Sequence, residues 1–157
     1  MNGPFESLLP DVEATQDLGR RLGRLIEPGL VVALLGDLGA GKTSLAKALI
    51  AVQGRVSEDD VVSPTFVLAC EYPGSVEVVH IDAYRLGGPE DLTDLGFELH
   101  SQVERAVLVE WAERVQDALP PDRLTVELEH DPGGRRVRVT AGGPRSERIL
   151  ACLRDAH

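Results

Sequence analysis

Residues 34–43 have the sequence Leu34-Leu35-Gly36-Asp37-Leu38-Gly39-Ala40-Gly41-Lys42-Thr43. A glycine, four residues and then Gly-Lys-Thr is typical of a loop that binds the phosphates of a nucleotide. Such a loop joins a buried strand to a helix. The apolar run 30–35 precedes it here, and apolar residues recur at helical spacing from Leu45 to Val52. The alternative is a glycine-rich turn with a solvated lysine, but such a turn would not need a buried strand before it and a helix after it.

Each part of the loop has an expected task. Three glycines let the backbone curl so that its N–H groups and the positive end of the helix dipole face the α- and β-phosphates. Lys42 is expected to reach the β- and γ-phosphate oxygens, and the Thr43 hydroxyl to take one coordination place on Mg²⁺. The predicted nucleotide-binding residues of the loop are Gly36, Asp37, Leu38, Gly39, Ala40, Gly41, Lys42, Thr43 and Ser44.

Composition limits the classes of protein that fit. The 157 residues suffice for one domain with one core. A net charge of −10 disfavours a strong sequence-independent grip on nucleic acid, so any link to RNA is expected to be indirect. Cys70 and Cys152 provide neither a disulfide framework nor metal-ligand spacing. With no apolar stretch of membrane-spanning length and no secretion signal, we expect a soluble cytoplasmic protein without a membrane partner.

The spacing of apolar residues predicts an α/β fold. Apolar runs separated by helical segments indicate a small, mostly parallel sheet flanked by helices, which a C-terminal antiparallel hairpin closes. The expected elements are a helix from the N-cap Asp11 to before Pro28, strands at 66–72, 76–82 and 106–109, a short helix between Pro89 and Gly96, hairpin strands at 124–129 and 136–140, and a helix at 146–156. Residues 1–157 are expected to form a single P-loop NTPase domain, with the nucleotide core at about 11–115 and the hairpin and last helix at about 122–157.

Two acidic residues stand at strand ends. Asp82 ends the run 76–82, and Glu110 follows the run 106–109. The carboxyl ends of parallel strands meet at one side of a sheet, so both carboxylates are expected near Lys42, where one could hold Mg²⁺ and the other could position water. Spacing does not say which acid does which. Either one could also be a turn or helix cap.

The segment Ser63-Pro64-Thr65-Phe66 lies between the loop helix and Asp82. Many nucleotide hydrolases keep a segment that senses the γ-phosphate in this part of the chain. Thr65 offers a hydroxyl and a backbone N–H for that task. The alternative is an ordinary proline turn that leads into a strand.

Five blocks of sequence together resemble the TsaE (YjeE) family, the bacterial ATPases of tRNA threonylcarbamoyladenosine biosynthesis. They follow the family's order with similar gaps, from about Asp11 to near Val139. The blocks are Gly36-Asp37-Leu38-Gly39-Ala40-Gly41-Lys42-Thr43, Ser63-Pro64-Thr65-Phe66, His80-x-Asp82-x-Tyr84-Arg85-Leu86, Pro89-Glu90-Asp91-Leu92 with Gly96, and Val109-Glu110-Trp111.

The resemblance implies a weak Mg²⁺-dependent ATPase. Thr43 and Glu110 would approach Mg²⁺, Asp82 would be needed for hydrolysis together with Lys42, and residues 63–66 would act as a switch through Thr65. Thr15 and Arg135 would border the nucleotide. Other side chains of the blocks would pack the site or contact partners, although a core role is open for the histidine and the aromatic residues; they are His80, Tyr84, Arg85 and Trp111.

The same resemblance implies a place in tRNA modification. The γ-phosphate state would control docking to a TsaD-like transferase and a TsaB-like protein, which modify adenosine 37 of tRNA, and the chain would meet tRNA only through that complex. The main rival is a small P-loop kinase that passes the γ-phosphate to a small molecule, although no long arginine-rich lid is present. A GTP switch lacks its Asn-Lys-x-Asp sequence. A binding module that has lost hydrolysis is a third class.

Overall fold

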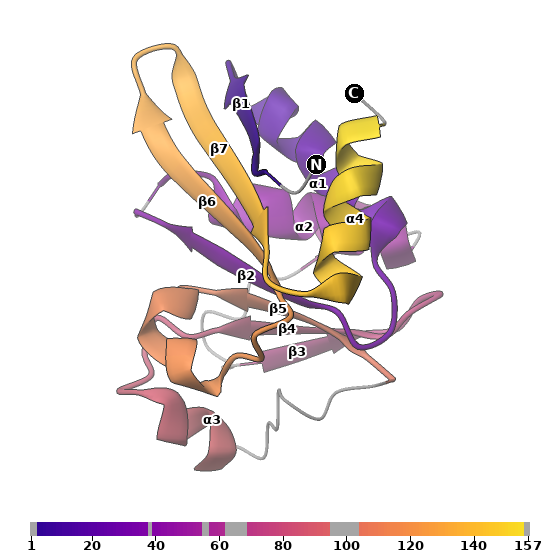
Figure 1. Ribbon diagram of the computed structural model, residues 1–157, viewed down its shortest axis with the longest axis vertical. Coiled ribbons are helices and arrows are strands. Elements are labelled where there is room, and N and C mark those ends of the chain that lie inside the picture. Colours follow the sequence, from indigo (N-terminus) through magenta and orange to yellow (C-terminus); the bar gives the residue numbers. More distant parts are fainter. Residues whose placement is uncertain (1–2, 38, 55–56, 62–68, 95–103, 156–157) are drawn as a thin grey trace.

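The computed structural model describes residues 3–37, 39–54, 57–61, 69–94 and 104–155 (Figure 1). In this part of the chain, seven strands form one sheet in the order β1-β7-β6-β2-β5-β4-β3. The strands are β1 (Phe5–Leu9), β2 (Val31–Gly36), β3 (Ala69–Tyr72), β4 (Val78–Asp82), β5 (Ala106–Glu110), β6 (Leu124–Asp131) and β7 (Gly134–Ala141). The molecule is a single-domain α/β fold, as the sequence predicts.

The sheet is mixed, which corrects the prediction of a mostly parallel sheet. The strands β6, β2, β5 and β4 are parallel to one another, whereas β1 with β7, β7 with β6 and β3 with β4 are antiparallel. Three of the six neighbouring pairs are therefore antiparallel. Two of the antiparallel pairs were not predicted: β1, whose short sequence does not mark it as a strand, pairs with β7, and β3 runs opposite to β4. The hairpin itself lies inside the sheet and does not close it, because β6 lies beside the central strand β2 and β1 lies outside β7.

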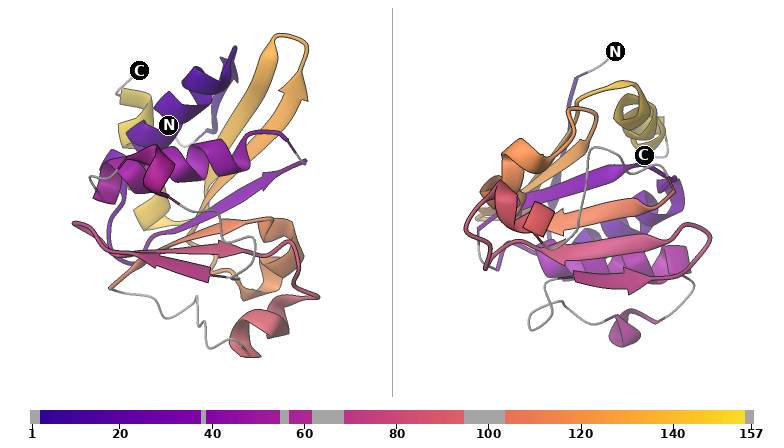
Figure 2. Two further views of the ribbon diagram at one scale, coloured as in Figure 1. Left: turned by 180° about the vertical axis from the view of Figure 1, so that it is seen from behind. Right: turned by 90° about the horizontal axis from the view of Figure 1, so that it is seen from below.

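Helices cover both faces of the sheet (Figure 2). One face packs against α1 (Val12–Leu25), α2 (Lys42–Gly54) and α4 (Pro144–Asp155), and the other packs against α3 (Pro89–Asp94) and the 3-10 helix η3 (Ala112–Ala118). Successive residues of a strand point to opposite faces. In β2, Val32 and Leu34 are accordingly buried against the first group of helices, while Val31 and Ala33 are buried against the second.

Glycines bring α1 close to α2. A Cβ atom at Gly19 would lie 2.5 Å from the carbonyl oxygen of Leu45, and one at Gly23 would lie 2.5 Å from that of Leu49. One turn earlier in α1, the side chain of Thr15 lies against the backbone of Gly41, where an added Cβ atom would be 3.3 Å from Cγ2 of Thr15. The two helices therefore run side by side in the same direction, and the first turn of α1 lies beside the loop that precedes α2.

The predicted N-cap begins α1. The carboxylate of Asp11 accepts a hydrogen bond of 2.8 Å from the Ala14 amide, which satisfies one of the free N–H groups of the first turn. The helix ends at Leu25, before Pro28, as its sequence predicts.

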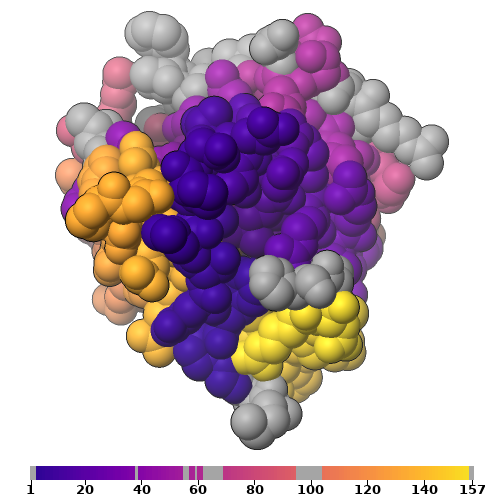
Figure 3. Space-filling view, turned by 90° about the horizontal axis from the view of Figure 1, so that it is seen from above, coloured from indigo at the N-terminus to yellow at the C-terminus, as the bar shows by residue number. Residues whose placement is uncertain are grey.

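The predicted C-terminal hairpin is confirmed by the antiparallel pairing of β6 and β7. On its outer side β7 pairs with β1, and Arg138 of β7 lies 3.6 Å from the carboxylate of Glu6 in β1. The N-terminal segment thus lies between the hairpin and α4, as the indigo, orange and yellow surfaces of Figure 3 show. The last helix is tied to the loop before β6, because Asp122 accepts hydrogen bonds from the amides of Arg145 and Ser146 at 3.0 Å each.

Some predicted features lie outside the described residues: Leu38 of the loop, the segment 63–66 with Thr65, the first residues of the strand predicted at 66–72, and Gly96. The described part of that strand is β3, and the strand predicted at 76–82 begins at Val78. None of the helices in the described ranges combines the length and the apolar character needed to cross a lipid bilayer.

Candidate functional site

A cavity of about 470 Å³ opens where the carboxyl ends of the central strands meet the first turns of α1 and α2 and the tip of the hairpin. This is the side of a parallel sheet at which ligands bind in α/β proteins. The cavity is lined by Leu9, Pro10, Asp11, Val12, Thr15, Gly39, Gly41, Lys42, Thr43, Ser44, Asp82, Tyr84, Glu110, Trp111, Gly134 and Arg135.

The loop between β2 and α2 has the curled backbone that its glycines predict. Gly36, Gly39 and Gly41 have φ angles of +143°, +78° and +106°, which residues with a side chain rarely adopt. A Cβ atom at Gly36 would also lie 2.4 Å from the carbonyl oxygen of Leu128 in β6. The helix α2 begins directly at Lys42, so the loop and the first helical turn line the cavity together.

Lys42 is folded back onto this loop. Its Nζ atom donates to the carbonyl oxygens of Gly36 and Asp37, the latter at 2.9 Å, and lies 3.9 Å from the centre of the Trp111 ring. The residue is 5 % exposed. Burial lowers the pKa of the Lys42 ammonium group, although the nearby carboxylates of Glu113 and Glu110 act in the opposite direction.

Glu110 is held by two side chains. Its Oε1 atom accepts a hydrogen bond of 3.0 Å from the Thr43 hydroxyl, and its Oε2 atom lies 2.6 Å from Nε2 of His80. Glu110 is only 2 % exposed. The two residues predicted to bind metal therefore touch each other. Among the described residues, no group of three or more His, Cys, Asp or Glu side chains gathers as a metal site.

Asp82 lies on the strand next to Glu110 and lines the same cavity. Its Oδ1 atom accepts a hydrogen bond of 2.9 Å from the amide of Tyr84, which turns the chain away from β4. Burial raises the pKa of Asp82. The hydrogen bond from Tyr84 lowers this pKa, while the negative charge of Glu110 raises it further. Asp82 thus caps a turn, the alternative role that its sequence position allowed, and also lines the cavity.

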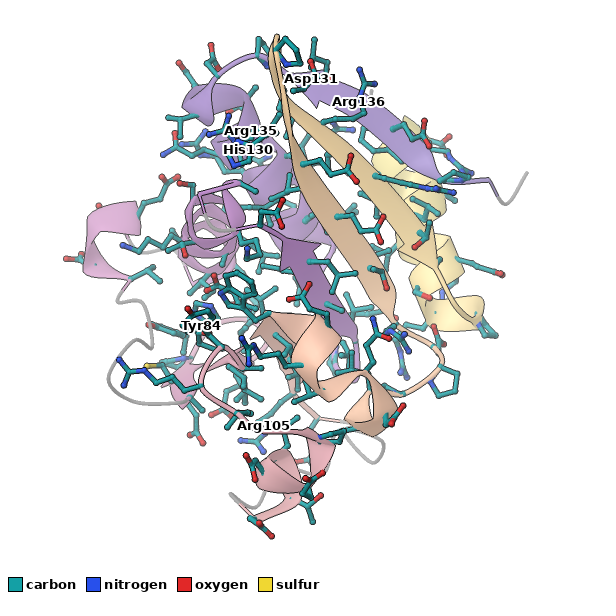
Figure 4. All side chains as sticks on the ribbon, turned by 90° about the vertical axis from the view of Figure 1, so that its left-hand side faces the viewer. Tyr84, Arg105, His130, Asp131, Arg135 and Arg136 are labelled. Carbon is teal, nitrogen blue, oxygen red and sulfur yellow. The ribbon has the colours of Figure 1, made fainter. Side chains whose placement is uncertain are left out.

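Thr15 and Arg135, which only the family resemblance pointed to, both line the cavity. Thr15 is buried in the first turn of α1. Arg135 lies at the tip of the hairpin (Figure 4), and its guanidinium group donates to the carbonyl oxygens of Gly39 and Gly134 at 3.0 Å each. This arginine therefore connects the hairpin to the glycine-rich loop.

Trp111 and Tyr84 close one side of the cavity. Their ring centres are 4.9 Å apart, and the guanidinium carbon of Arg114 lies 5.1 Å from the centre of the Tyr84 ring. The two rings thus lie between two cationic side chains, with Lys42 over Trp111 and Arg114 over Tyr84. Trp111 has φ 57° and ψ 42°, the one left-handed conformation of a residue other than glycine in the described ranges.

Other parts of the site differ from the sequence prediction or were not found by it. Gly36, Asp37 and Ala40 do not line the cavity, although they shape the loop behind it. Glu113 was missed: burial raises the pKa of its carboxyl group, while the positive charge of Lys42 and the nearby Gly36 amide act in the opposite direction. Its only sequence signal is a position three residues after Glu110.

A family model described as "Threonylcarbamoyl adenosine biosynthesis protein TsaE" matches residues 9–137. The chain belongs to the TsaE family. Every residue that lines the cavity, from Leu9 to Arg135, lies inside the matched range, whereas α4 lies outside it. The TsaE match therefore covers the whole candidate site.

Individual TsaE proteins match over most of their lengths. The chain is 39 % identical over 142 residues to "tRNA threonylcarbamoyladenosine biosynthesis protein TsaE" of Streptomyces coelicolor, a match that covers 83 % of this chain and 92 % of that protein. A protein of the same name from Haemophilus influenzae is 31 % identical over 151 residues, with 92 % and 94 % covered. The fold is similar to the crystal structure of Bacillus subtilis YdiB, with a TM-score of 0.75, 28 % identity and coverage of 98 % of this chain and 94 % of that one.

Proposed function

We propose that this TsaE protein binds ATP with Mg²⁺ in the cavity at the start of α2, hydrolyses it slowly, and uses the nucleotide state as a switch in the threonylcarbamoyladenosine modification of tRNA. One observation carries the proposal. Gly39 and Gly41 of the glycine-rich loop line one cavity together with the side chains predicted to act on the nucleotide, which are Lys42, Thr43, Glu110 and Asp82. That set matches the chemical needs of a bound triphosphate.

The triphosphate would lie along the loop, against the first turn of α2. Backbone N–H groups at a helix start favour negative charge. Lys42 would exchange its carbonyl partners and the face of Trp111 for phosphate oxygens, a stronger charge-assisted interaction. Arg135 already reaches the Gly39 carbonyl oxygen from the hairpin, so it is suitably placed to border the nucleotide, and Thr15 does the same from α1.

The donor set fits Mg²⁺. This ion prefers oxygen ligands and is usually held by one or two carboxylates together with phosphate and water. Thr43 and Glu110 offer a hydroxyl and a carboxylate oxygen that are 3.0 Å apart at the start of α2. When bound, Mg²⁺ would neutralise charge on the phosphate oxygens.

Asp82 is the best candidate for positioning the attacking water. It lies beside Glu110, and its carboxylate lines the cavity without a basic side chain paired to it in the described residues. Thr65 is proposed to sense the γ-phosphate from the segment 63–66, on the ground of sequence alone. The proposed partners are a TsaD-like transferase and a TsaB-like protein, through which the chain would act on tRNA.

Calorimetry and phosphate release test the nucleotide part of this proposal. The wild-type protein should bind ATP with Mg²⁺ and release phosphate slowly without any acceptor molecule. Lys42→Ala should abolish binding, whereas Asp82→Ala should bind ATP and release no phosphate. Normal phosphate release by the Asp82 variant would remove that assignment, and strong stimulation by one small-molecule acceptor would indicate a kinase.

Pull-down with a non-hydrolysable ATP analogue tests the switch. The transferase and its companion should be retained with the triphosphate analogue and lost with ADP. Equal recovery with either nucleotide, or with none, would contradict nucleotide control of docking.

A further inference from the structure

We infer that His80 is a positioning residue that fixes the carboxylate of Glu110 for Mg²⁺-dependent nucleotide binding; the inference rests on the proposed function. Nε2 of His80 lies 2.6 Å from Oε2 of Glu110, and Oε1 of the same carboxylate lies 3.0 Å from the Thr43 hydroxyl. The three side chains form a continuous chain of contacts from β4 through β5 to the first turn of α2.

The register of the sheet places His80 in this role. β4 and β5 are parallel, with His80 opposite Leu108 and Asp82 opposite Glu110. Because side chains alternate along a strand, His80 and Glu110 project from the same face of the sheet, two positions apart on neighbouring strands. This is the face that packs against α2, where Thr43 begins the helix.

The surroundings of His80 are otherwise those of an apolar core. Val78, Ala106 and Leu108 share its face of the sheet and belong to the large buried cluster. His80 is 0 % exposed, and its Nδ1 atom has no hydrogen-bond partner in the described residues. The contact with Glu110 is therefore the polar interaction that compensates for burying this imidazole. An aliphatic side chain would suffice if filling space were the only task.

The contact constrains the direction of the Glu110 carboxylate. A carboxylate anchored through one oxygen presents the other oxygen in a fixed direction, and here that oxygen points to Thr43. Partners behind a metal-binding side chain orient it in this way, and their loss typically weakens metal binding by about 10- to 100-fold. Loss of His80 should therefore act on the Mg²⁺ dependence of ATP affinity more than on ATP affinity without Mg²⁺.

Two amide variants test the inference. In His80→Gln the side-chain NH₂ group can occupy the place of Nε2 and donate to Glu110, whereas in His80→Asn it is too short to do so. A matched control is Val79→Ala, which removes buried atoms from the adjacent residue of β4 on the opposite face of the sheet. ATP affinity is measured with Mg²⁺ and with EDTA for all three variants and the wild type, and direct Mn²⁺ binding with ADP is followed by electron paramagnetic resonance.

His80→Asn should reduce the gain in affinity that Mg²⁺ provides by about 10-fold or more, with weaker Mn²⁺ binding, while His80→Gln and Val79→Ala keep most of this gain. An unchanged gain in His80→Asn, or a loss of equal size in His80→Gln, would overturn the positioning role. A wild-type protein whose ATP affinity does not respond to Mg²⁺ would instead overturn the metal assignment proposed above, and the inference with it.

Discussion

The Nζ atom of Lys42 lies 3.9 Å from the centre of the Trp111 ring, and the backbone of Trp111 is held in the left-handed conformation. A bulky residue in that conformation stores about 1–3 kcal/mol of strain. The attraction between a buried cation and an indole ring stabilises the folded protein by about 2 kcal/mol, which offsets this strain. The strained tryptophan thus holds the lysine that the proposed function requires for phosphate binding.

Trp111 is the one tryptophan of the chain, so its fluorescence reports on this contact. Addition of ATP with Mg²⁺ should change the emission of the wild-type protein, because Lys42 leaves the ring for the phosphates. Lys42→Met has similar length but no charge. It should alter the emission of the free protein and abolish the response to ATP. Calorimetric ATP binding by the wild type without any change in emission would contradict this account.

Asp82→Asn should increase stability at neutral pH while stopping ATP turnover. Burial raises the pKa of Asp82, so the folded state binds this proton more tightly than the unfolded state. Stability from this group is thus fully present below its ordinary pKa and is lost as pH rises through the raised value. Asparagine keeps the acceptor for the Tyr84 amide without the charge.

The measurement is urea unfolding of both proteins from pH 3 to pH 8. The advantage of the asparagine variant should grow as pH rises and vanish at the acidic end. A constant difference over the whole range would mean that the charge of Asp82 is not its cause.

Gly23→Ala should destabilise the protein, although alanine favours helices by about 1 kcal/mol. The new Cβ would lie 2.3 Å from Cγ1 of Val52 and 2.5 Å from the Leu49 carbonyl oxygen, so α1 must move away from α2. Overpacking of this kind costs about 1–3 kcal/mol. Thermal unfolding measures the loss, and Arg24→Ala, on the exposed side of α1, should leave the midpoint nearly unchanged.

Asp122→Ala should destabilise the attachment of α4 by about 1–2 kcal/mol at pH 7, the usual cost of losing a helix cap. Burial raises the pKa of Asp122, but the hydrogen bonds from Ser146 and Arg145 outweigh this and leave the pKa below its ordinary value. This contribution is present above the ordinary pKa of aspartate and is lost as pH falls through the lowered one. Urea unfolding should show the difference between the two proteins beginning to shrink as pH falls below about 4, the ordinary pKa of aspartate; a difference that does not shrink as pH falls further would contradict the role of the charge.

Local patterns explain which parts of the fold and site could be predicted. The loop and α2 follow from a motif whose glycines must adopt φ angles that other residues avoid, and those angles are present at Gly36 and Gly41. Asp82 and Glu110 could be placed because the ends of parallel strands meet at one side of a sheet. Both predictions need only a few neighbouring residues and a general rule of topology.

Contacts between distant segments could not be predicted in this way. β1 is five residues long and pairs with β7, more than 120 residues later, so nothing near Phe5 indicates its partner. The insertion of β6 beside β2 likewise depends on the whole sheet. The positions of Trp111 and Glu113 beside Lys42 depend on the direction in which η3 leaves β5, and the spacing of residues does not determine that direction.

Because β1 pairs with β7, the strand at this edge of the sheet has five residues instead of the eight of β7. Without Phe5–Leu9, the peptide groups along one side of β7 would be exposed as a template for another chain. A protein shortened to begin after Pro10 would also lose Leu9 and Pro10 from the cavity wall. The same deletion would therefore expose an edge of β7 and damage the cavity. Such a truncated protein would aggregate through the exposed strand even if the rest of the fold persists.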